Sequence, residues 1–317
     1  MKTWFLCFLL LGSVPGKEQS DSLRLLFWNV ENYFDWRADS TSTSEQEFSS
    51  RGERHWTRKR FTAKSNAVAK SLLWVAGQEG GLPDVIGLAE VENAFVLRRL
   101  LQETALQKLD YRVVHFDSPD PRGIDVALLY RASRLQLTGA KPCHLYQGDS
   151  LLRTRDILLA EFRDAAGTPL AVLVNHHPSK YGGAAVSEPR RALAVDRLKF
   201  LADSLLAEGT ERIVAMGDFN DTPANPVYKC LEPPFTNLAE PLYAKGRGTI
   251  KYEGVWELID MIFVTEACRA GPMHIREIPF LMVPDKAYAG NKPLRTYSGP
   301  RYLGGVSDHC PVTCKIP

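Results

Sequence analysis

The chain has 317 residues, of which 44% are hydrophobic and 24% are charged, and its formal net charge is +2. This length allows a large buried core in one or two domains, and the lack of a repeat at a solenoid period excludes a repeat protein. The small net charge does not identify a binding partner.

Residues 1–16 have the pattern of a secretory signal peptide. Lys2 precedes the apolar run Trp4–Leu11, and small or turn residues follow it. That run is too short to span a membrane. We therefore expect a secreted or periplasmic protein whose mature chain has no transmembrane segment. No linker interrupts residues 22–317, so we expect them to form a single domain. The alternative for the first residues is a buried strand or helix.

Five segments share one pattern, a short apolar run beside acids, amides or histidines. Such runs predict strands that are buried on both faces and whose polar residues emerge at the carboxyl ends. In open α/β sheets, ligands bind in the crevice at those ends. In chain order the segments are Leu25–Asn32, Asp84–Asn93, Val172–Ser179, Ile213–Asp221 and Gly304–Val312.

The polar residues at these strand ends are expected to converge on one site, and they include Asn29, Glu90, His176, Asp218 and Asn220. A sixth segment, Glu257–Phe263, places Asp260 inside an apolar run, where a buried carboxylate requires a partner. Near the end of the chain Asp308 lies directly beside His309. That pair can hold a metal-bound phosphate and handle protons near neutral pH.

Two helices are predicted between the strands. Thr57 can cap one helix, and Ser187 with Pro189 opens a second helix, which Gly209 closes. Each has one apolar stripe, so we expect both to pack on the outside of the sheets.

Three basic segments are candidates for phosphate contact. The run from Arg51 to Arg60, interleaved with aromatic residues, either lines a groove or forms a solvated helix start. Arg122 either contacts a phosphate or pairs with Asp125. The loop from residue 291 to 305 immediately precedes Asp308, so its cations and aromatics should reach the same cleft. Its candidate substrate-binding residues are Arg295, Tyr297 and Arg301.

Removal of the signal peptide leaves five cysteines, Cys143, Cys230, Cys268, Cys310 and Cys314. An odd number outside the cytoplasm leaves at least one free thiol unless two chains pair. No C-x-x-C pair is present. We expect structural core cysteines and no zinc site.

The motif "GDFN" at Gly217–Asn220 and the motif "SDHxPV" at Ser307–Val312 accompany an early "WN" and the mid-chain acid Glu90. In this order they resemble the endonuclease/exonuclease/phosphatase superfamily, from about Leu23 to the C-terminus. The resemblance implies an α+β fold, a four-layer α/β/β/α sandwich of two mostly antiparallel sheets with helices outside.

The resemblance also implies a role for each site residue. Asn29 and Glu90 would help to hold a divalent metal, with Glu31 assisting and Asp308 near the same ion. Mg²⁺ is expected from the hard oxygen ligands, and Mn²⁺ or Ca²⁺ is also compatible. The residues with catalytic roles would be Asp218 and Asn220 at the reacting phosphorus, His309 braced by Asp260, and His176 near the leaving group.

These roles together lead us to expect an exported metal-dependent phosphodiesterase, first of all a nuclease acting on DNA or RNA. The alternatives are a phosphatase or lipid phosphoesterase of the same superfamily, acting on sphingomyelin or inositol phosphates, and an inactive module that binds a phosphate ligand. No stable protein partner is implied, and a monomer is expected. The tyrosine of abasic-site enzymes has no match near His176, which argues against abasic-site repair.

Overall fold

The structure is a computed structural model that describes residues 22–37, 47–180 and 183–317. The predicted signal peptide, residues 1–16, lies outside these residues. Within the described ranges, no helix combines the length and the apolar character needed to cross a bilayer.

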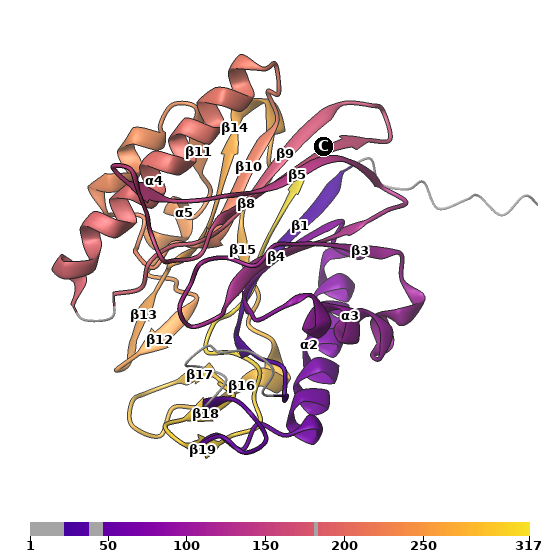
Figure 1. Cartoon of the computed structure of the whole chain (residues 1–317), viewed down its shortest axis with the longest axis vertical. Helices are drawn as coiled ribbons and strands as arrows, with labels where there is room; N and C mark the ends of the chain where they lie inside the picture. Colours follow the sequence, from indigo (N-terminus) through magenta and orange to yellow (C-terminus); the bar gives the residue numbers. More distant parts are fainter. Residues whose placement is uncertain (1–21, 38–46, 181–182) are drawn as a thin grey trace, which may run out of the picture.

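Two six-stranded sheets form the middle of the molecule (Figure 1). In the first sheet only β1 and β2 are parallel, and every other neighbouring pair is antiparallel. The strand order is β15 (His274–Ile275), β20 (Val312–Ile316), β1 (Leu23–Tyr33), β2 (Val85–Val91), β4 (Asp125–Arg131) and β3 (Tyr111–His115).

The second sheet has the same plan, with one central parallel pair, β9 and β10, among antiparallel neighbours. Its order is β11 (Phe235–Asn237), β14 (Asp260–Thr265), β10 (Ile213–Asp218), β9 (Pro169–His176), β8 (Ile157–Asp164) and β5 (Leu135–Cys143). The prediction of two mostly antiparallel sheets is therefore confirmed.

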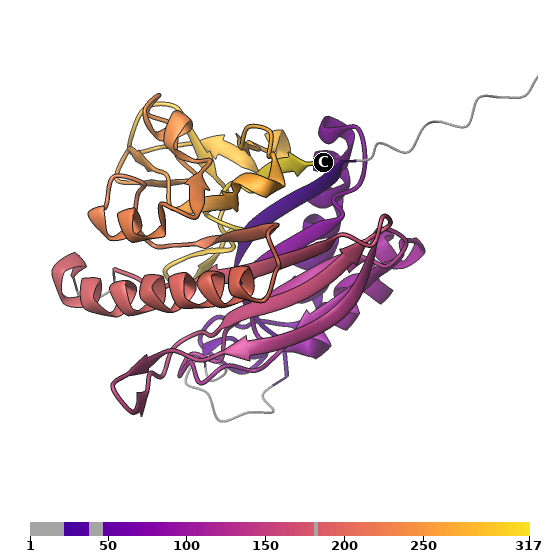
Figure 2. The same cartoon turned by 90° about the horizontal axis from the view of Figure 1, so that it is seen from above.

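Helices cover the outer faces of both sheets (Figures 1 and 2). On the side of the first sheet lie α2 (Arg58–Glu79) and α3 (Ala94–Gln102), and on the side of the second sheet lies α4 (Ala184–Ala207). A further helix, the short α5 (Glu240–Tyr243), follows β11 in the chain. The predicted four-layer sandwich is confirmed.

The apolar strands are buried on both faces, as predicted. Along β1, Leu25 and Phe27 join a hydrophobic cluster with residues of β9, β10 and α4. Leu26 and Trp28 join a second cluster, which contains residues of α2 and α3. This alternation follows from the two-residue period of a strand, and it explains why the sequence shows a continuous apolar run.

Four short hairpins connect the main elements. They are β6 (Tyr146–Gln147) with β7 (Ser150–Leu151), β12 (Ile250–Tyr252) with β13 (Val255–Glu257), β16 (Met282–Pro284) with β17 (Asn291–Pro293), and β18 (Tyr297–Ser298) with β19 (Arg301–Tyr302). The segment from 291 to 305, predicted as a loop, therefore contains three short strands.

The helix starts show one confirmed and one wrong prediction. Thr57 caps α2, because its side chain accepts a hydrogen bond from the Arg60 N–H. The second helix begins at Ala184 rather than near Ser187, and Pro189 lies inside it. The Ser187 hydroxyl donates to the Gly183 carbonyl instead of capping the helix. A proline within the first two turns removes only one helical hydrogen bond, so the helix can start earlier than the sequence indicates.

All five cysteines of the described residues are free, and all except Cys230 are buried. The expectation of cysteines in the core is confirmed for the four buried ones.

Glu79, near the end of α2, joins this helix to the first sheet. Its carboxylate accepts a hydrogen bond from Thr313 Oγ1 at 2.6 Å and pairs with Lys315 at 3.2 Å and with Arg276. Burial opposes the charged form, but the bond from Thr313 and the Arg276 guanidinium outweigh it and lower the pKa of Glu79. The contact therefore stabilises the chain only while the carboxylate is charged.

Glu79→Gln is expected to lower the free energy of unfolding at pH 7 by about 1 to 3 kcal/mol, the range for charged hydrogen bonds. A carboxylate with a lowered folded-state pKa stabilises above its ordinary pKa and loses this effect as the pH falls. The difference from wild type should therefore narrow below pH 4.5, the ordinary value. Urea denaturation at several pH values measures it, with the exposed Glu211→Gln as control. Equal midpoints at pH 7 would contradict this role.

Candidate active site

The predicted site residues from the second sheet lie at one end of its central strands. His176 ends β9, Asp218 ends β10 and Asp260 begins β14. Asp218 lies opposite His176 on one side and opposite Asp260 on the other. Gly217 allows this close pairing, since a Cβ added there would lie 2.4 Å from the Asn175 carbonyl oxygen.

The first sheet contributes Asn29 from β1 and Glu90 from β2, which are parallel neighbours. Asn29 Nδ2 donates to Asp218 Oδ2 at 3.0 Å, so the two sheets meet here through a direct hydrogen bond. The same Asp218 oxygen lies 3.7 Å from His176 Nε2 and 3.9 Å from His309 Nε2. The structure therefore brings these residues together at the ends of both parallel pairs.

His309 is held from both sides. Its Nδ1 lies 2.8 Å from Asp260 Oδ2, the contact that the sequence predicts. Its carbonyl accepts a hydrogen bond from Trp28 Nε1 at 2.9 Å, and its N–H donates to Ser307 Oγ. Ser307 Oγ in turn donates to the Asn29 carbonyl at 2.6 Å. These bonds fix the imidazole relative to β1 and β14.

The two histidines have opposite pKa shifts. Burial lowers the pKa of His309, but the carboxylates of Asp260 and Asp218 outweigh burial and hold it well above its usual value. Burial and the Arg155 guanidinium hold the pKa of His176 well below its usual value. One imidazole is therefore charged and the other is neutral near pH 7, which suits them to different tasks.

Burial also raises the pKa of Asp218 to about 7, against the lowering effect of His309. A carboxyl group with this pKa can take up and release a proton near neutral pH. Asn220 N donates to Asp218 Oδ1 at 2.9 Å, and Asn220 Nδ2 donates to the His177 carbonyl. Asp218 is thus held in place by amide donors.

Acids gather beside this cluster. Glu31 accepts from Arg295 at 2.9 Å and from Thr296 N at 2.8 Å, and the same Arg295 nitrogen lies 3.1 Å from Asp308 Oδ2. Burial and the Asp308 carboxylate raise the pKa of Glu31 to about 7. The buried Lys64 donates to the Glu31 carbonyl and to Thr296 Oγ1. The carboxylates of Glu31 and Asp308 therefore concentrate negative charge here, and the cations Arg295 and Lys64 lie beside them.

Glu90 and Arg122 form the other border of the site. Glu90 Oε2 accepts from Asn32 N at 2.8 Å and lies 3.7 Å from Arg122 Nη2. Arg122 also donates to Asn32 Oδ1 at 2.9 Å. Asp125 instead accepts from Ser118 and contacts His115, so the alternative that Arg122 pairs with Asp125 is wrong.

Several site residues have a left-handed backbone conformation that residues other than glycine rarely adopt. Four of them have positive φ, namely Glu31 (47°), Asn32 (49°), Glu90 (61°) and Asn220 (52°). Each such residue costs roughly 1–3 kcal/mol and persists only where its surroundings impose it. Their gathering here supports a functional role for this edge of the sheets.

Two predicted substrate-binding residues lie elsewhere. Tyr297 is buried, donates from its hydroxyl to the Arg54 carbonyl and packs against Trp56, so its ring serves the packing of this region rather than substrate contact. Arg301 is exposed on β19, and within the described ranges no hydrogen bond or ion pair joins it to the acids. Trp56 within the Arg51–Arg60 run and Phe61 directly after it are also buried, so these rings line no groove.

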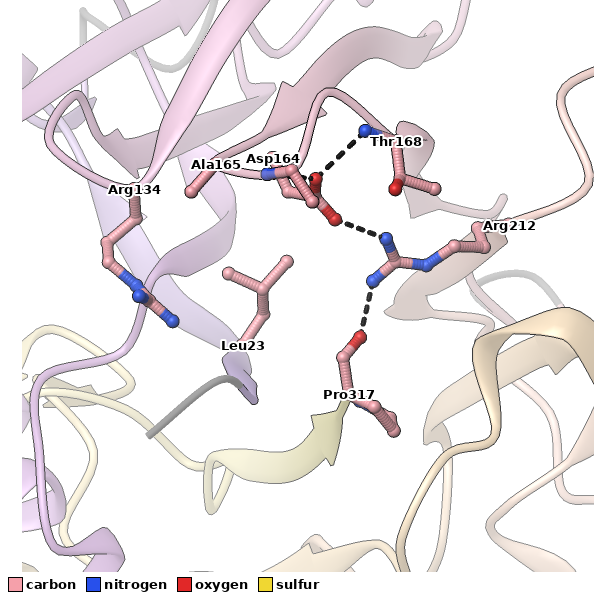
Figure 3. Close-up of a pocket in the computed structure, with 8 residues that line it drawn as sticks. Leu23, Arg134, Asp164, Ala165, Thr168, Arg212 and Pro317 are labelled. Carbon is pink, nitrogen blue, oxygen red and sulfur yellow. Dashed lines mark hydrogen bonds and ion pairs between the residues drawn. The ribbon is translucent and has the colours of Figure 1, made fainter. Parts of the chain in front are cut away.

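One cavity lies beside the predicted site residues, and another lies far from them. A groove of about 280 Å³ opens beside Arg295 and Asp308, with Lys251, Tyr252 and Lys292 also in its lining. A cavity of about 490 Å³ lies at the opposite ends of β1, β9 and β10. There the Arg212 guanidinium donates to Asp164 and to the Pro317 carbonyl (Figure 3), so its charge is already paired. The remote cavity contains no predicted site residue.

Compact groups of acids and histidines occur twice in the described part of the chain. One is Asp218, Asp260 and His309, and the other is His115, Asp117 and Asp125; in each, the ligand atoms lie within 4.8 Å of one another. The predicted carboxylate ligands Glu31, Glu90 and Asp308 belong to neither group and are spaced more widely.

Sequence reasoning missed several residues that shape the site. Lys64 is fully buried on the apolar face of α2, and Ser307 connects Asn29 to His309. Lys64 follows Phe61 and precedes Val68 at helical spacing, so a lysine on a buried stripe was the available signal. Trp28 belongs to the early "WN" motif, but its bond to the His309 carbonyl has no sequence signal, because a buried indole resembles any core aromatic.

The comparisons with known proteins agree with this architecture. The chain resembles the catalytic domain of human Nocturnin with bound sulfate (17% identity, TM-score 0.59, 93% of each chain covered). It resembles D. rerio TDP2 complexed with a single strand DNA product (16% identity, TM-score 0.55, 93% and 99% covered). A third is an endonuclease/exonuclease/phosphatase family protein from Bacteroides thetaiotaomicron (13% identity, TM-score 0.61, 93% and 97% covered).

At these identities the structural likeness shows the fold alone. A comparison with curated proteins gives no match. The sequence itself matches the Endonuclease/Exonuclease/phosphatase family over residues 24–317, which is nearly the whole chain. The protein therefore belongs to the Endonuclease/Exonuclease/phosphatase family.

Proposed function

We propose that this protein is an exported, divalent-metal-dependent phosphodiesterase that hydrolyses DNA or RNA. The observation that carries the proposal is the connected cluster of Asp218, His176 and the His309–Asp260 pair, beside the acids Glu31, Glu90 and Asp308. The complex of D. rerio TDP2 with a single strand DNA product supports nucleic acid as the first substrate to test. Export rests on the pattern of residues 1–16.

The acids beside the cluster fit a hard divalent cation. Burial and then the Asp308 carboxylate raise the pKa of Glu31 to about 7 in spite of Arg295 and Lys64, so a further cation beside Glu31 would stabilise its charged form. Carboxylate and amide oxygens of Glu90, Asp308, Glu31 and Asn29 are the ligands that Mg²⁺ prefers, with Mn²⁺ or Ca²⁺ as alternatives. A bound divalent cation would supply charge stabilisation for the phosphoryl oxygens.

The side chains divide the remaining work between them. Asp218, with a pKa of about 7, orients the attacking water and accepts its proton. The charged His309, fixed by Asp260, stabilises negative charge on the phosphoryl group. The Asn220 amide donates to a phosphoryl oxygen. His176 lies on the other side of Asp218 and is assigned to the leaving oxygen. Phosphoryl transfer needs chiefly such positioning and charge stabilisation.

A substrate panel tests the proposal. Purified mature protein is assayed with Mg²⁺ and with a chelator on plasmid DNA, RNA, bis(p-nitrophenyl) phosphate, a phosphomonoester, an inositol phosphate and sphingomyelin. We expect chelator-sensitive hydrolysis of nucleic acid and of the simple diester. Preferential release of phosphate from a monoester, or cleavage of the lipid, would replace nuclease with the corresponding activity. Ligand binding without hydrolysis of any ester would indicate an inactive binding module.

Glu90→Gln is expected to weaken Mg²⁺ binding by about tenfold or more, because it removes one charge from the proposed ligand set. Two measurements check this: the Mg²⁺ concentration for half-maximal activity, and the rise in melting temperature on addition of Mg²⁺. The control is Glu103→Gln at the end of α3. If Mg²⁺ shifts the melting temperature of Glu90→Gln and wild type equally, Glu90 is no ligand.

A further inference from the structure

A second pocket adjoins the catalytic cluster. It has a volume of about 360 Å³ and lies between the loop before β4, the segment joining β7 to β8, and the first turns of α4. Its lining contains four arginines and one acid, together with small and hydroxyl-bearing residues. The charged residues are Arg122, Arg153, Arg155, Arg190 and Asp120. We refer to it as the arginine pocket.

Two of the four arginines of the pocket, Arg155 and Arg122, face the acids Asp120 and Glu90, and the other two have no partner among the described residues. Asp120 is already engaged, since its Oδ2 accepts from Arg155 Nη1 at 2.9 Å and its Oδ1 accepts from Arg122 N at 2.9 Å. Arg153 and Arg190 are exposed, and neither forms a hydrogen bond or ion pair with the residues that the structure describes. The remote cavity near Pro317 differs, because its Arg212 is paired with Asp164.

The arginine pocket shares its walls with the catalytic cluster. The buried Arg155 donates from Nη2 to the His177 carbonyl at 2.7 Å, and Asn220 donates to the same oxygen at 2.9 Å. Arg122 borders Glu90 on the other side. A ligand that reaches the cluster therefore has this concentration of positive charge beside it.

We propose that the arginine pocket binds a second phosphate group of the substrate, distinct from the phosphate that is hydrolysed. This inference rests on the proposed phosphodiesterase function. Guanidinium groups match phosphate oxygens in geometry and stay charged at any physiological pH, so exposed arginines around a concave site suit a dianionic or monoanionic phosphate. The phosphate belongs either to the adjacent link of a polynucleotide or to the terminus of a short nucleotide.

The test compares substrates that differ by one phosphate. They are a dinucleoside monophosphate, the same dinucleotide with a 5′-terminal or a 3′-terminal phosphate, and a trinucleoside diphosphate. For wild type, kcat/KM should be higher for substrates with a second phosphate. In the variant Arg153→Gln/Arg190→Gln this preference should fall about tenfold or more, the size expected for loss of charged hydrogen bonds.

The control is Arg98→Gln/Arg112→Gln, which removes two exposed arginines outside the pocket and should keep the preference. If both double variants lower the preference for a second phosphate equally, the preference depends only on the overall charge of the protein, and the inference is overturned. The same holds if the pocket variant keeps the wild-type preference. If kcat/KM rises for the trinucleotide alone, the second phosphate is the adjacent link of a polynucleotide. If it rises for a terminally phosphorylated dinucleotide, the second phosphate is that of a chain end.

A binding experiment separates this inference from the proposed function. Inorganic pyrophosphate is titrated calorimetrically into each protein in the presence of a chelator. Binding to wild type that weakens about tenfold in Arg153→Gln/Arg190→Gln, but not in the control, supports the arginine pocket even if no diester is hydrolysed. Absence of binding to wild type, or equal binding to all three proteins, refutes it whatever the outcome of the substrate panel.

Discussion

Asp218→Asn is expected to lower kcat by roughly 10²- to 10⁴-fold, the contribution usual for a positioned general base. Asparagine has the same size, but its single carbonyl oxygen can accept from only one of Asn29 and Asn220, and it cannot take a proton from water. Single-turnover hydrolysis of a simple phosphodiester at saturating Mg²⁺ measures the chemical step. Asp203→Asn, on an exposed part of α4, is the control.

The same substitution should raise the melting temperature. Burial raises the pKa of Asp218, so its charged form destabilises the folded chain at pH values above the ordinary carboxyl pKa. A neutral amide removes that cost, which exceeds the loss of one accepted hydrogen bond, so loss of activity accompanies a gain in stability. A variant that melts as wild type does and keeps more than about a tenth of its kcat would remove Asp218 from the chemical step.

His309→Ala is expected to cause a comparable loss of kcat, because it removes the charged imidazole that faces Asp218. Asp260→Asn should share much of this loss, since Asp260 fixes the orientation and charge of His309. Residues that act as a unit are non-additive, so the double variant should lose little more than His309→Ala alone.

The matched control for this pair is His144→Ala. His144 makes the same kind of contact with Asp156, at 2.9 Å, next to the edge strand β5. If the loss in His309→Ala and Asp260→Asn reflected only a broken histidine–aspartate contact, His144→Ala would show it too. Full additivity of His309→Ala and Asp260→Asn would mean that the two residues act separately.

The sequence alone predicts the strands that carry the site, but it does not predict how these strands are arranged in sheets. Continuous apolar runs at β1, β2, β9 and β10 predict strands buried on both faces, and the polar residues after them converge as expected. Periodicity does not reveal strand direction, so the two-sheet sandwich came from the resemblance alone. The start of α4 was misplaced because Pro189 resembles a first-turn proline.

The interior of the site was less predictable. Asp260 was recognised because a carboxylate within an apolar run demands a partner, and it contacts His309. An aromatic among cations and glycines resembles a ligand contact in the sequence, whereas the ring of Tyr297 is buried and packs against Trp56. The arginine pocket is formed by segments that are distant in the sequence, and no local sequence pattern predicts that they lie together.

The bond between Trp28 and the His309 carbonyl has a consequence for biosynthesis. It joins positions 281 residues apart, and the strands on which they depend, β1 and β20, are neighbours in one sheet. A nascent polypeptide on the ribosome therefore lacks this neighbouring strand and one imidazole until the ribosome has passed Ile316. A translation product that stops before His309 should accordingly be unable to assemble the cluster around Asp218.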